Sequence, residues 1–320
     1  YIILNNQLSN KLYISDNNLY LKENNKKLKI NIIFFHKNIY KLYQEKWIKD
    51  CIYSCLNQEN VLFDIYEINY GNEDISIFDN IPFNRKHQFF IKNYDTHTEA
   101  MLFLLKQCFD IDNYDIVFNT NLDDIYHQDR FTKQLNDIVD NDTYLNSSFW
   151  VYIDEENKLL KGRDNCIYYK DNNFKKKIIK DFKNKINDEE VKYNIIKNEL
   201  EKENNVFNHS GICFNKKYWK SLDKHNNLLR YRNDKPFEDL SLWIRSIQNN
   251  IRMKIINENL IYYRIHTNSI GTQQKSNKID KTFKQKINLN SVIIGFMVII
   301  HNKNDLKKIL EIKKRIKKDI

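Results

Sequence analysis

Apolar runs alternate with amphipathic stretches in the first part of the chain, and this alternation restricts the fold more than any other feature. Residues 30–35 are almost entirely apolar, and apolar residues then recur at helical spacing from Trp47 to Leu56. A second apolar run follows at 61–68. Strand, helix and strand in this order predict an α/β domain with a mainly parallel central sheet flanked by helices.

Further elements continue this pattern. Thr96 and Glu99 have the spacing of a capping box, which predicts a helix that starts there and leads to a strand at 114–118. Order is expected again at 206–214. A helix is expected next, with an inner face formed by Leu240, Trp243, Ile244 and Ile247. Strands at 253–256 and 260–266 should then complete the core.

The acidic segment 121–130 directly follows the strand at 114–118. Its adjacent carboxylates, Asp123 and Asp124, would lie at the carboxyl edge of the sheet, where α/β proteins bind ligands. Carboxylates there suit a hard divalent cation that bridges phosphate oxygens. The alternative is a solvated turn that only stabilises the N-terminus of a helix at 129–140.

Composition excludes several classes of protein. The net charge of +10 raises the question of nucleic acid, but Lys residues are scattered among Asn, Asp and Glu, as on a solvated surface. The longest apolar run, 292–300, is far shorter than the roughly 20 residues of a membrane span. Five cysteines without a CxxC pair indicate neither a disulfide framework nor a zinc site. We therefore expect a soluble, cytoplasmic protein with no nucleic-acid partner.

The abundance of Asn, Lys, Ile and Tyr is typical of a very AT-rich genome, such as that of a giant virus or a low-GC bacterium. For a viral protein, the location would be the host cytoplasm or the virion. The sequence opens at Tyr1 without a Met, as an excised piece of a longer chain would.

Three parts are expected along the chain. Residues 1–28 are polar and predict an N-terminal arm or hairpin. Residues 29–271 form the main domain, with a charged insertion at about 155–205. Residues 272–320 are a linker followed by a strand and a helix, which either close this domain or begin a second, truncated one.

Four segments resemble, in order and spacing, motifs of the family 2 glycosyltransferases of the GT-A fold. They are the strand, helix and strand at 30–68 leading into an acidic turn, the DxD-like segment 121–130, the Glu-Asp segment 236–245 and the Tyr-Arg-x-His segment 262–266. The resemblance covers about residues 29–271. It implies a Rossmann-like sheet and a hexosyltransferase that moves a sugar from a nucleotide sugar, most simply a UDP-sugar, to a glycan or protein acceptor.

The resemblance also implies roles for single residues. Asp123 would bind Mn²⁺ or Mg²⁺ with His266 as a second ligand, and an imidazole favours Mn²⁺. Asp239 would be the general base of an inverting transfer. The donor would contact Phe35, His36, Asn69, Asn121, Leu122, Asp123 and Arg264. The sugar and acceptor pocket would contain His209, Ser210, Gly211, Glu238 and Trp243.

Some of these roles have structural alternatives. Glu238 and Asp239 could cap a helix, His266 could be a buried histidine with internal partners, and Trp243 could be a core residue. The family often has acidic residues where this chain has Asn69 and Asn121, which leaves a degenerate, inactive member possible.

Two other functions remain open. A nucleotidyltransferase also uses carboxylates and a metal, but it usually carries a glycine-rich, basic phosphate loop near its N-terminus, and this chain has none there. A basic module that binds polyanions or nucleic acid would bind less tightly at high salt and would tolerate Asp123→Ala and Asp239→Ala. The sequence indicates no oligomeric state.

Overall fold

The computed structural model describes residues 8–16, 18–58, 61–160, 189–202, 205–224 and 238–266, without the side chains of 222–224 and 238. The chain divides into two units, Tyr1–His266 and Thr267–Ile320, and all described residues belong to the first. The predicted linker, strand and helix at 272–320 and the larger part of the charged insertion lie outside the described residues.

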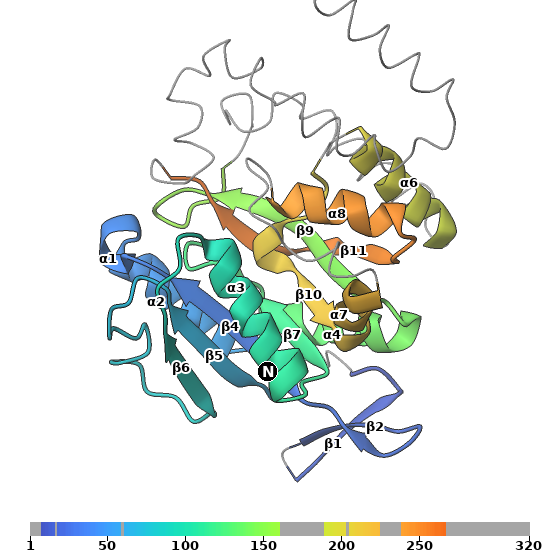
Figure 1. Ribbon diagram of the computed structural model, residues 1–320, viewed down its shortest axis with the longest axis horizontal. Helices are drawn as coiled ribbons and strands as arrows, with labels where there is room; N and C mark the ends of the chain where they lie inside the picture. The colour runs from blue at the N-terminus through green and yellow to red at the C-terminus, as the bar shows by residue number, and fades with distance from the viewer. Residues whose placement is uncertain are drawn as a thin grey trace, which may run out of the picture. The chain divides into compact units, whose positions relative to one another are not determined.

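A mixed sheet of eight strands forms the centre of the described part of the chain (Figure 1), in the order β6-β5-β4-β7-β10-β9-β11-β8. The strands are β4 (Ile30–His36), β5 (Asp64–Asn69), β6 (His87–Ile91), β7 (Ile116–Asn119), β8 (Ile125–Tyr126), β9 (Leu145–Ile153), β10 (Cys213–Asn215) and β11 (Met253–Arg264). Strands β6, β5, β4 and β7 pair in parallel, as do β9 and β11, whereas β10 and β8 are antiparallel to their neighbours. The predicted α/β class with a mainly parallel sheet is confirmed.

Helices cover both faces of this sheet. Helices α2 (Glu45–Leu56) and α4 (Arg130–Asn141), with the short α1 (Ile39–Leu42), contribute to one hydrophobic core. Helices α3 (His97–Lys106), α6 (Glu189–Glu201), α7 (Lys216–Lys224) and α8 (Glu238–Gln248), with the π-helical turn η1 (Gln107–Ile111), pack on the other face. Successive side chains of a strand point to opposite faces, so Ile32 belongs to the first core and Ile33 to the second.

The predicted capping box starts α3. The hydroxyl oxygen of Thr96 accepts a hydrogen bond from the backbone N–H of Glu99 at 3.3 Å, and the Glu99 carboxylate accepts one from the backbone N–H of Thr96 at 3.1 Å. Two N–H groups at the start of the helix are thereby satisfied.

The N-terminal segment forms a small antiparallel sheet of its own from β1 (Leu12–Ser15), β2 (Asn18–Leu21) and β3 (Lys26–Lys27). Leu12 and Leu19 belong to the core that contains α2 and α4. The backbone N–H of Ser9 donates to the side chain of Asn136 in α4 at 2.8 Å. This segment is therefore packed on the main domain rather than projecting from it.

Several boundaries differ from the predicted ones. The strand expected at 61–68 is β5, which begins at Asp64. The two strands expected near the end are one strand, β11, with irregular pairing where it was expected to break. The inner face of α8 contains Leu242 as well as Trp243 and Ile247, whereas Leu240 and Ile244 are only half-buried. No helix in the described ranges is long and apolar enough to cross a membrane.

Candidate active site

The turn between β7 and β8 carries the two adjacent carboxylates, and their surroundings differ. Asp124 is buried, and its Oδ1 accepts a hydrogen bond from the backbone N–H of Arg264 at 2.9 Å. Burial and the nearby charge of Asp123 raise the pKa of Asp124 well above its ordinary value. The side chain of Asp123 is 19% exposed and faces His266. Of the two carboxylates, Asp123 is the one that can reach a ligand.

Asp123 and His266 form a pair that could hold a divalent cation. Oδ2 of Asp123 lies 3.1 Å from Nε2 of His266, whose ring packs on Trp47 with 4.8 Å between ring centres. A carboxylate and an imidazole this close together could both bind one divalent cation. The described residues contain no cluster of three or more metal-binding side chains, so further ligands would come from phosphate oxygens or water.

Arg264 fixes the acidic turn in place. Its buried guanidinium donates from Nε to the carbonyl oxygen of Asp123 at 2.8 Å, and from Nη1 to the carbonyl oxygen of Asp154 at 2.9 Å and to Oδ1 of Asn157 at 2.6 Å. It also lies 5.2 Å from the centre of the Trp47 ring. These hydrogen bonds from Nε and Nη1 give Arg264 a positioning role for the backbone of the acidic turn.

Tyr126 and Arg130 support the same turn from within the protein. The Tyr126 hydroxyl accepts a hydrogen bond from the backbone N–H of Asn121 at 2.8 Å. Arg130 donates to the carbonyl oxygen of Asn119 at 2.8 Å, and its guanidinium carbon lies 4.2 Å from the centre of the Tyr126 ring. Both side chains are buried, so this part of the DxD-like segment shapes the backbone.

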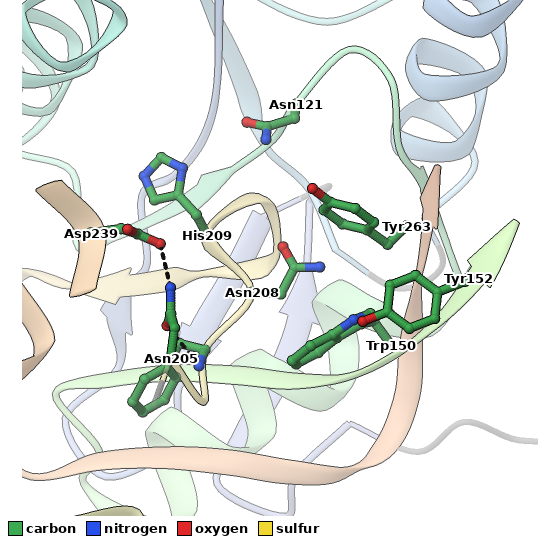
Figure 2. Close-up of a pocket in the computed structure, with 9 residues that line it drawn as sticks. Asn121, Trp150, Tyr152, Asn205, Asn208, His209, Asp239 and Tyr263 are labelled. Atoms are coloured by element: carbon green, nitrogen blue, oxygen red, sulfur yellow. Dashed lines mark hydrogen bonds between the residues drawn. The ribbon is translucent and has the colours of Figure 1, made fainter. Parts of the chain in front are cut away.

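A cavity of about 560 Å³, a volume that includes space open to solvent, begins at this turn (Figure 2). Its lining residues are Asn121, Trp150, Tyr152, Asn205, Phe207, Asn208, His209, Asp239 and Tyr263. Three of them, Asn121, His209 and Asp239, were predicted from segments far apart in the sequence. The fold brings these three side chains to one site.

Asp239 lies in the first turn of α8 and is held by two hydrogen bonds. Its Oδ1 accepts from the backbone N–H of Leu240 at 2.8 Å, and its Oδ2 accepts from the side-chain amide of Asn205 at 2.7 Å (Figure 2). Asp239 thus lies both in the first turn of the helix and in the cavity wall. The side chain of Glu238 lies outside the described residues.

Sequence reasoning missed the aromatic wall of the cavity. Trp150 and Tyr152 lie two residues apart on β9, and Tyr263 lies on the neighbouring strand β11, in register with Tyr152. The Tyr152 and Tyr263 rings meet edge to face with 5.9 Å between their centres. The alternation of aromatic residues at 150 and 152 was the available signal, but their partner strand was not apparent from sequence.

Three predicted donor contacts turn out to be structural. Nε2 of His36 lies 2.7 Å from Oε1 of Glu67, and both side chains are fully buried. Asn69 is also buried, and its amide accepts from the backbone N–H of Gly71 at 2.9 Å and donates to the carbonyl oxygen of residue 75 at 3.3 Å. Leu122 belongs to the hydrophobic core. None of these three side chains is available to a nucleotide in this conformation.

Phe35 differs from its neighbour His36 because it points to the other face of the sheet. Its half-buried ring stacks on His97 with 6.3 Å between ring centres, and His97 lies 6.3 Å from His209 of the cavity wall. Phe35 and His36 are the two residues of β4 predicted to contact the sugar donor. The row of rings formed by Phe35, His97 and His209 connects only Phe35 of these two to the cavity.

Three predicted pocket residues lie behind the cavity wall. The Ser210 hydroxyl is buried and donates to Oδ1 of Asn208 at 2.8 Å in the short 3₁₀ turn His209–Gly211. Gly211 packs directly against Ile261 of β11. Trp243 is fully buried and packs against Phe207, which agrees with the alternative interpretation of Trp243 as a core residue.

The sequence matches no protein-family model. No curated protein matches it either. Among solved structures, the chain is similar to S. aureus TarS 1–349, with a TM-score of 0.48 and 13% identity over 82% of this chain and 76% of that one. It is also similar to S. aureus TarS 1–349 in complex with UDP-GlcNAc, with a TM-score of 0.47 and 13% identity over 75% of this chain and 59% of that one.

A third structure, S. aureus TarS, gives a TM-score of 0.45 and 13% identity over 75% of this chain and 37% of that one. The chain therefore spans less than two thirds of the length of two of these three structures.

Proposed function

We propose that the chain is a GT-A glycosyltransferase that moves a sugar from a nucleotide sugar, with a UDP-sugar as the favoured donor, to an acceptor hydroxyl with inversion. One observation carries the proposal. Asn121, His209 and Asp239 come from three separate segments and line one cavity, and the turn that contributes Asn121 also holds Asp123 against His266. This is the arrangement that the motif resemblance implies.

Asp123 and His266 would hold the metal ion, with Mn²⁺ favoured over Mg²⁺ because one ligand is an imidazole. The ion would neutralise the developing charge of the nucleoside diphosphate as it leaves. Arg264 supports this role by fixing the backbone of Asp123 through the 2.8 Å hydrogen bond to its carbonyl oxygen.

Asp239 would act as the general base. As the acceptor oxygen bonds to the anomeric carbon, its proton passes to the Asp239 carboxylate, and the bond from the anomeric carbon to the diphosphate oxygen breaks. Among the described residues that line the cavity, Asp239 is the one carboxylate. A single base and direct attack from the side opposite the leaving group lead to inversion.

A cytoplasmic location is part of the same proposal. The described cysteines, Cys51, Cys55, Cys108 and Cys213, are buried free thiols, and free thiols are compatible with the reducing conditions of a cytoplasm.

The experiment is a panel of UDP-, GDP-, dTDP- and CMP-sugars with and without Mn²⁺, read as thermal shift and as donor hydrolysis. We expect one nucleotide class to stabilise the protein only with metal. Asp123→Ala should abolish this shift, whereas Asp239→Asn should keep it and lose transfer. Asp142→Asn, at a side chain that is 69% exposed, is the matched control.

No response to any donor, with or without metal, would reject the proposal. Binding of polyanions that weakens with salt and persists in Asp123→Ala would instead indicate a polyanion-binding module.

A further inference from the structure

The cavity that contains Asp239 has two chemically different sides (Figure 2). Asp239, Asn205 and His209 lie on one side, and Trp150, Tyr152 and Tyr263 lie on the other. The lining contains three side-chain amides, those of Asn121, Asn205 and Asn208. An amide offers both hydrogen-bond donors and an acceptor, so each of these groups can pair with a hydroxyl that accepts or with one that donates.

The aromatic side is fixed by the pairing of β9 with β11. Tyr152 and Tyr263 are directly opposed across the two strands, and Trp150 is two residues earlier on the same face of β9. Trp150 and Tyr152 are 6% and 5% exposed, so only limited parts of their surfaces face the cavity, and packing holds the rings in place. Such a surface suits a ligand with an apolar face that stacks without rearrangement of the wall.

The charges around the cavity restrict the chemical class of its ligand further. The chain has 52 Lys and Arg residues, yet the described residues that line the cavity include none of them and one carboxylate, Asp239. Among the described residues that line the cavity, a bound phosphate or carboxylate would meet the like charge of Asp239 and no Lys or Arg side chain. Burial of an unpaired charge is strongly unfavourable.

We propose that this cavity binds the acceptor as an uncharged saccharide unit, with the C–H face of its ring against the aromatic side and a hydroxyl directed to Asp239. The inference rests on the proposed function and narrows it, because it excludes phosphorylated and acidic acceptors. A sugar hydroxyl can both donate and accept, as the three amides require.

The test measures acceptor-site binding without any donor. Titration calorimetry or ligand-observed NMR would compare methyl glycosides of glucose, galactose and N-acetylglucosamine, and disaccharides of these sugars, with glucose 6-phosphate and glucuronic acid. We expect at least one uncharged saccharide to bind, and its phosphorylated or acidic analogue to bind at least about tenfold more weakly. Asp239→Asn should narrow this difference, because it removes the like charge.

Tyr263→Leu keeps an apolar side chain but removes the ring, and we expect it to weaken saccharide binding about tenfold. Tyr262→Leu is the matched control, because Tyr262 is the preceding half-buried residue of β11 and does not line the cavity. Trp150→Leu provides a second variant of the same wall if Tyr263→Leu lowers the melting temperature.

Donor binding is measured in parallel as the metal-dependent thermal shift, which separates the two proposals. A normal donor shift together with preferred binding of the charged saccharides, or with binding of no saccharide, would overturn this inference and leave the glycosyltransferase proposal intact. Saccharide binding without any donor shift would reject the proposed function.

Discussion

The side-chain amide of Asn205 donates a 2.7 Å hydrogen bond to Oδ2 of Asp239. Asn205 follows α6, and Asp239 lies in the first turn of α8, so the contact joins two segments on one side of the cavity. An amide does not titrate, so it orients the carboxylate without competing for a proton. Asn205 therefore has the properties of a positioning residue for the proposed base.

Asn205→Asp should change the pH dependence of transfer. Two carboxylates at this distance share a proton, which raises the apparent pKa of the pair. If Asp239 is the base, the acidic limb of the pH profile of kcat/KM should move up by at least about one unit. Asn249→Asp adds the same charge at an exposed position of the chain and should leave the limb in place. An unchanged limb in Asn205→Asp would argue against Asp239 as the base.

Metal dependence should follow the Asp123 and His266 pair. Removal of divalent ions by EDTA should abolish the donor-induced thermal shift of the wild type, and Mn²⁺ should restore it. His266→Gln should require much more Mn²⁺ for the same shift, because it replaces an imidazole with a weaker ligand. His127→Gln, at a histidine that is 35% exposed and does not line the cavity, should behave as the wild type. Equal Mn²⁺ requirements in both variants would remove His266 from the metal site.

Local patterns predicted much of the fold. The capping box at Thr96, the apolar run of β4 and the helical spacing from Trp47 to Leu56 depend on neighbours within a few residues, and each element is present. The helical spacing of Trp243 also predicted its buried position in the core. Sequence order and motif type also brought Asn121, His209 and Asp239 together in one prediction.

The positions of the remaining site residues depend on pairing between strands that are distant in the sequence. His36 was predicted to meet a nucleotide, but the parallel pairing of β4 with β5 buries it against Glu67. The motif marked Arg264 as a site residue, yet its partners come from turns about 110 and 141 residues away. The aromatic side of the cavity exists only because β9 pairs with β11. Such pairings cannot be inferred from the spacing of residues along one segment.

Arg264→Lys should destabilise both the fold and the metal site. A single ammonium cannot replace hydrogen bonds from Nε and Nη1 that diverge to Asp123 and Asp154. We expect a loss of about 3 kcal/mol in the free energy of unfolding, measured with urea. Arg252→Lys is the control, because Arg252 is 58% exposed and lies 3.5 Å from Glu190, a geometry that contributes little. Similar losses in both variants would contradict the positioning role of Arg264.

Gly211→Ala should disturb the packing behind the cavity. A Cβ at this position would lie 1.9 Å from Cδ1 of Ile261 and 3.0 Å from its Cγ1. Overpacking of this kind costs about 1–3 kcal/mol. Ile261→Val removes Cδ1, so the double variant should recover part of the loss, and a double-mutant cycle by urea unfolding measures the coupling. Additive effects would show that Ile261 is not the clashing group.

The buried carboxylate of Glu67 should make stability depend on acid pH. Its oxygens lie 2.7 Å from Nε2 of His36 and 2.8 Å from Nε2 of His87, and they accept hydrogen bonds from the Ser76 hydroxyl and from the backbone N–H of residue 77. Burial alone would raise the pKa of Glu67, but the hydrogen bonds from His36 and His87 outweigh it and lower the pKa from 4.5 to about 2. The folded state therefore holds the ionised form more strongly than the unfolded chain does.

A pKa lowered by folding contributes stability that is complete above the unfolded value of 4.5 and is lost as the pH falls from there toward 2. The contribution at neutral pH is on the order of 3 kcal/mol. Glu67→Gln should therefore be much less stable than the wild type in urea at pH 7, and the difference should shrink as the pH falls through this window. Glu156→Gln, at a side chain that is 69% exposed, should follow the wild type throughout. If the difference in unfolding free energy between Glu67→Gln and the wild type stays constant from pH 7 to pH 3, packing and not the charge of Glu67 stabilises the network.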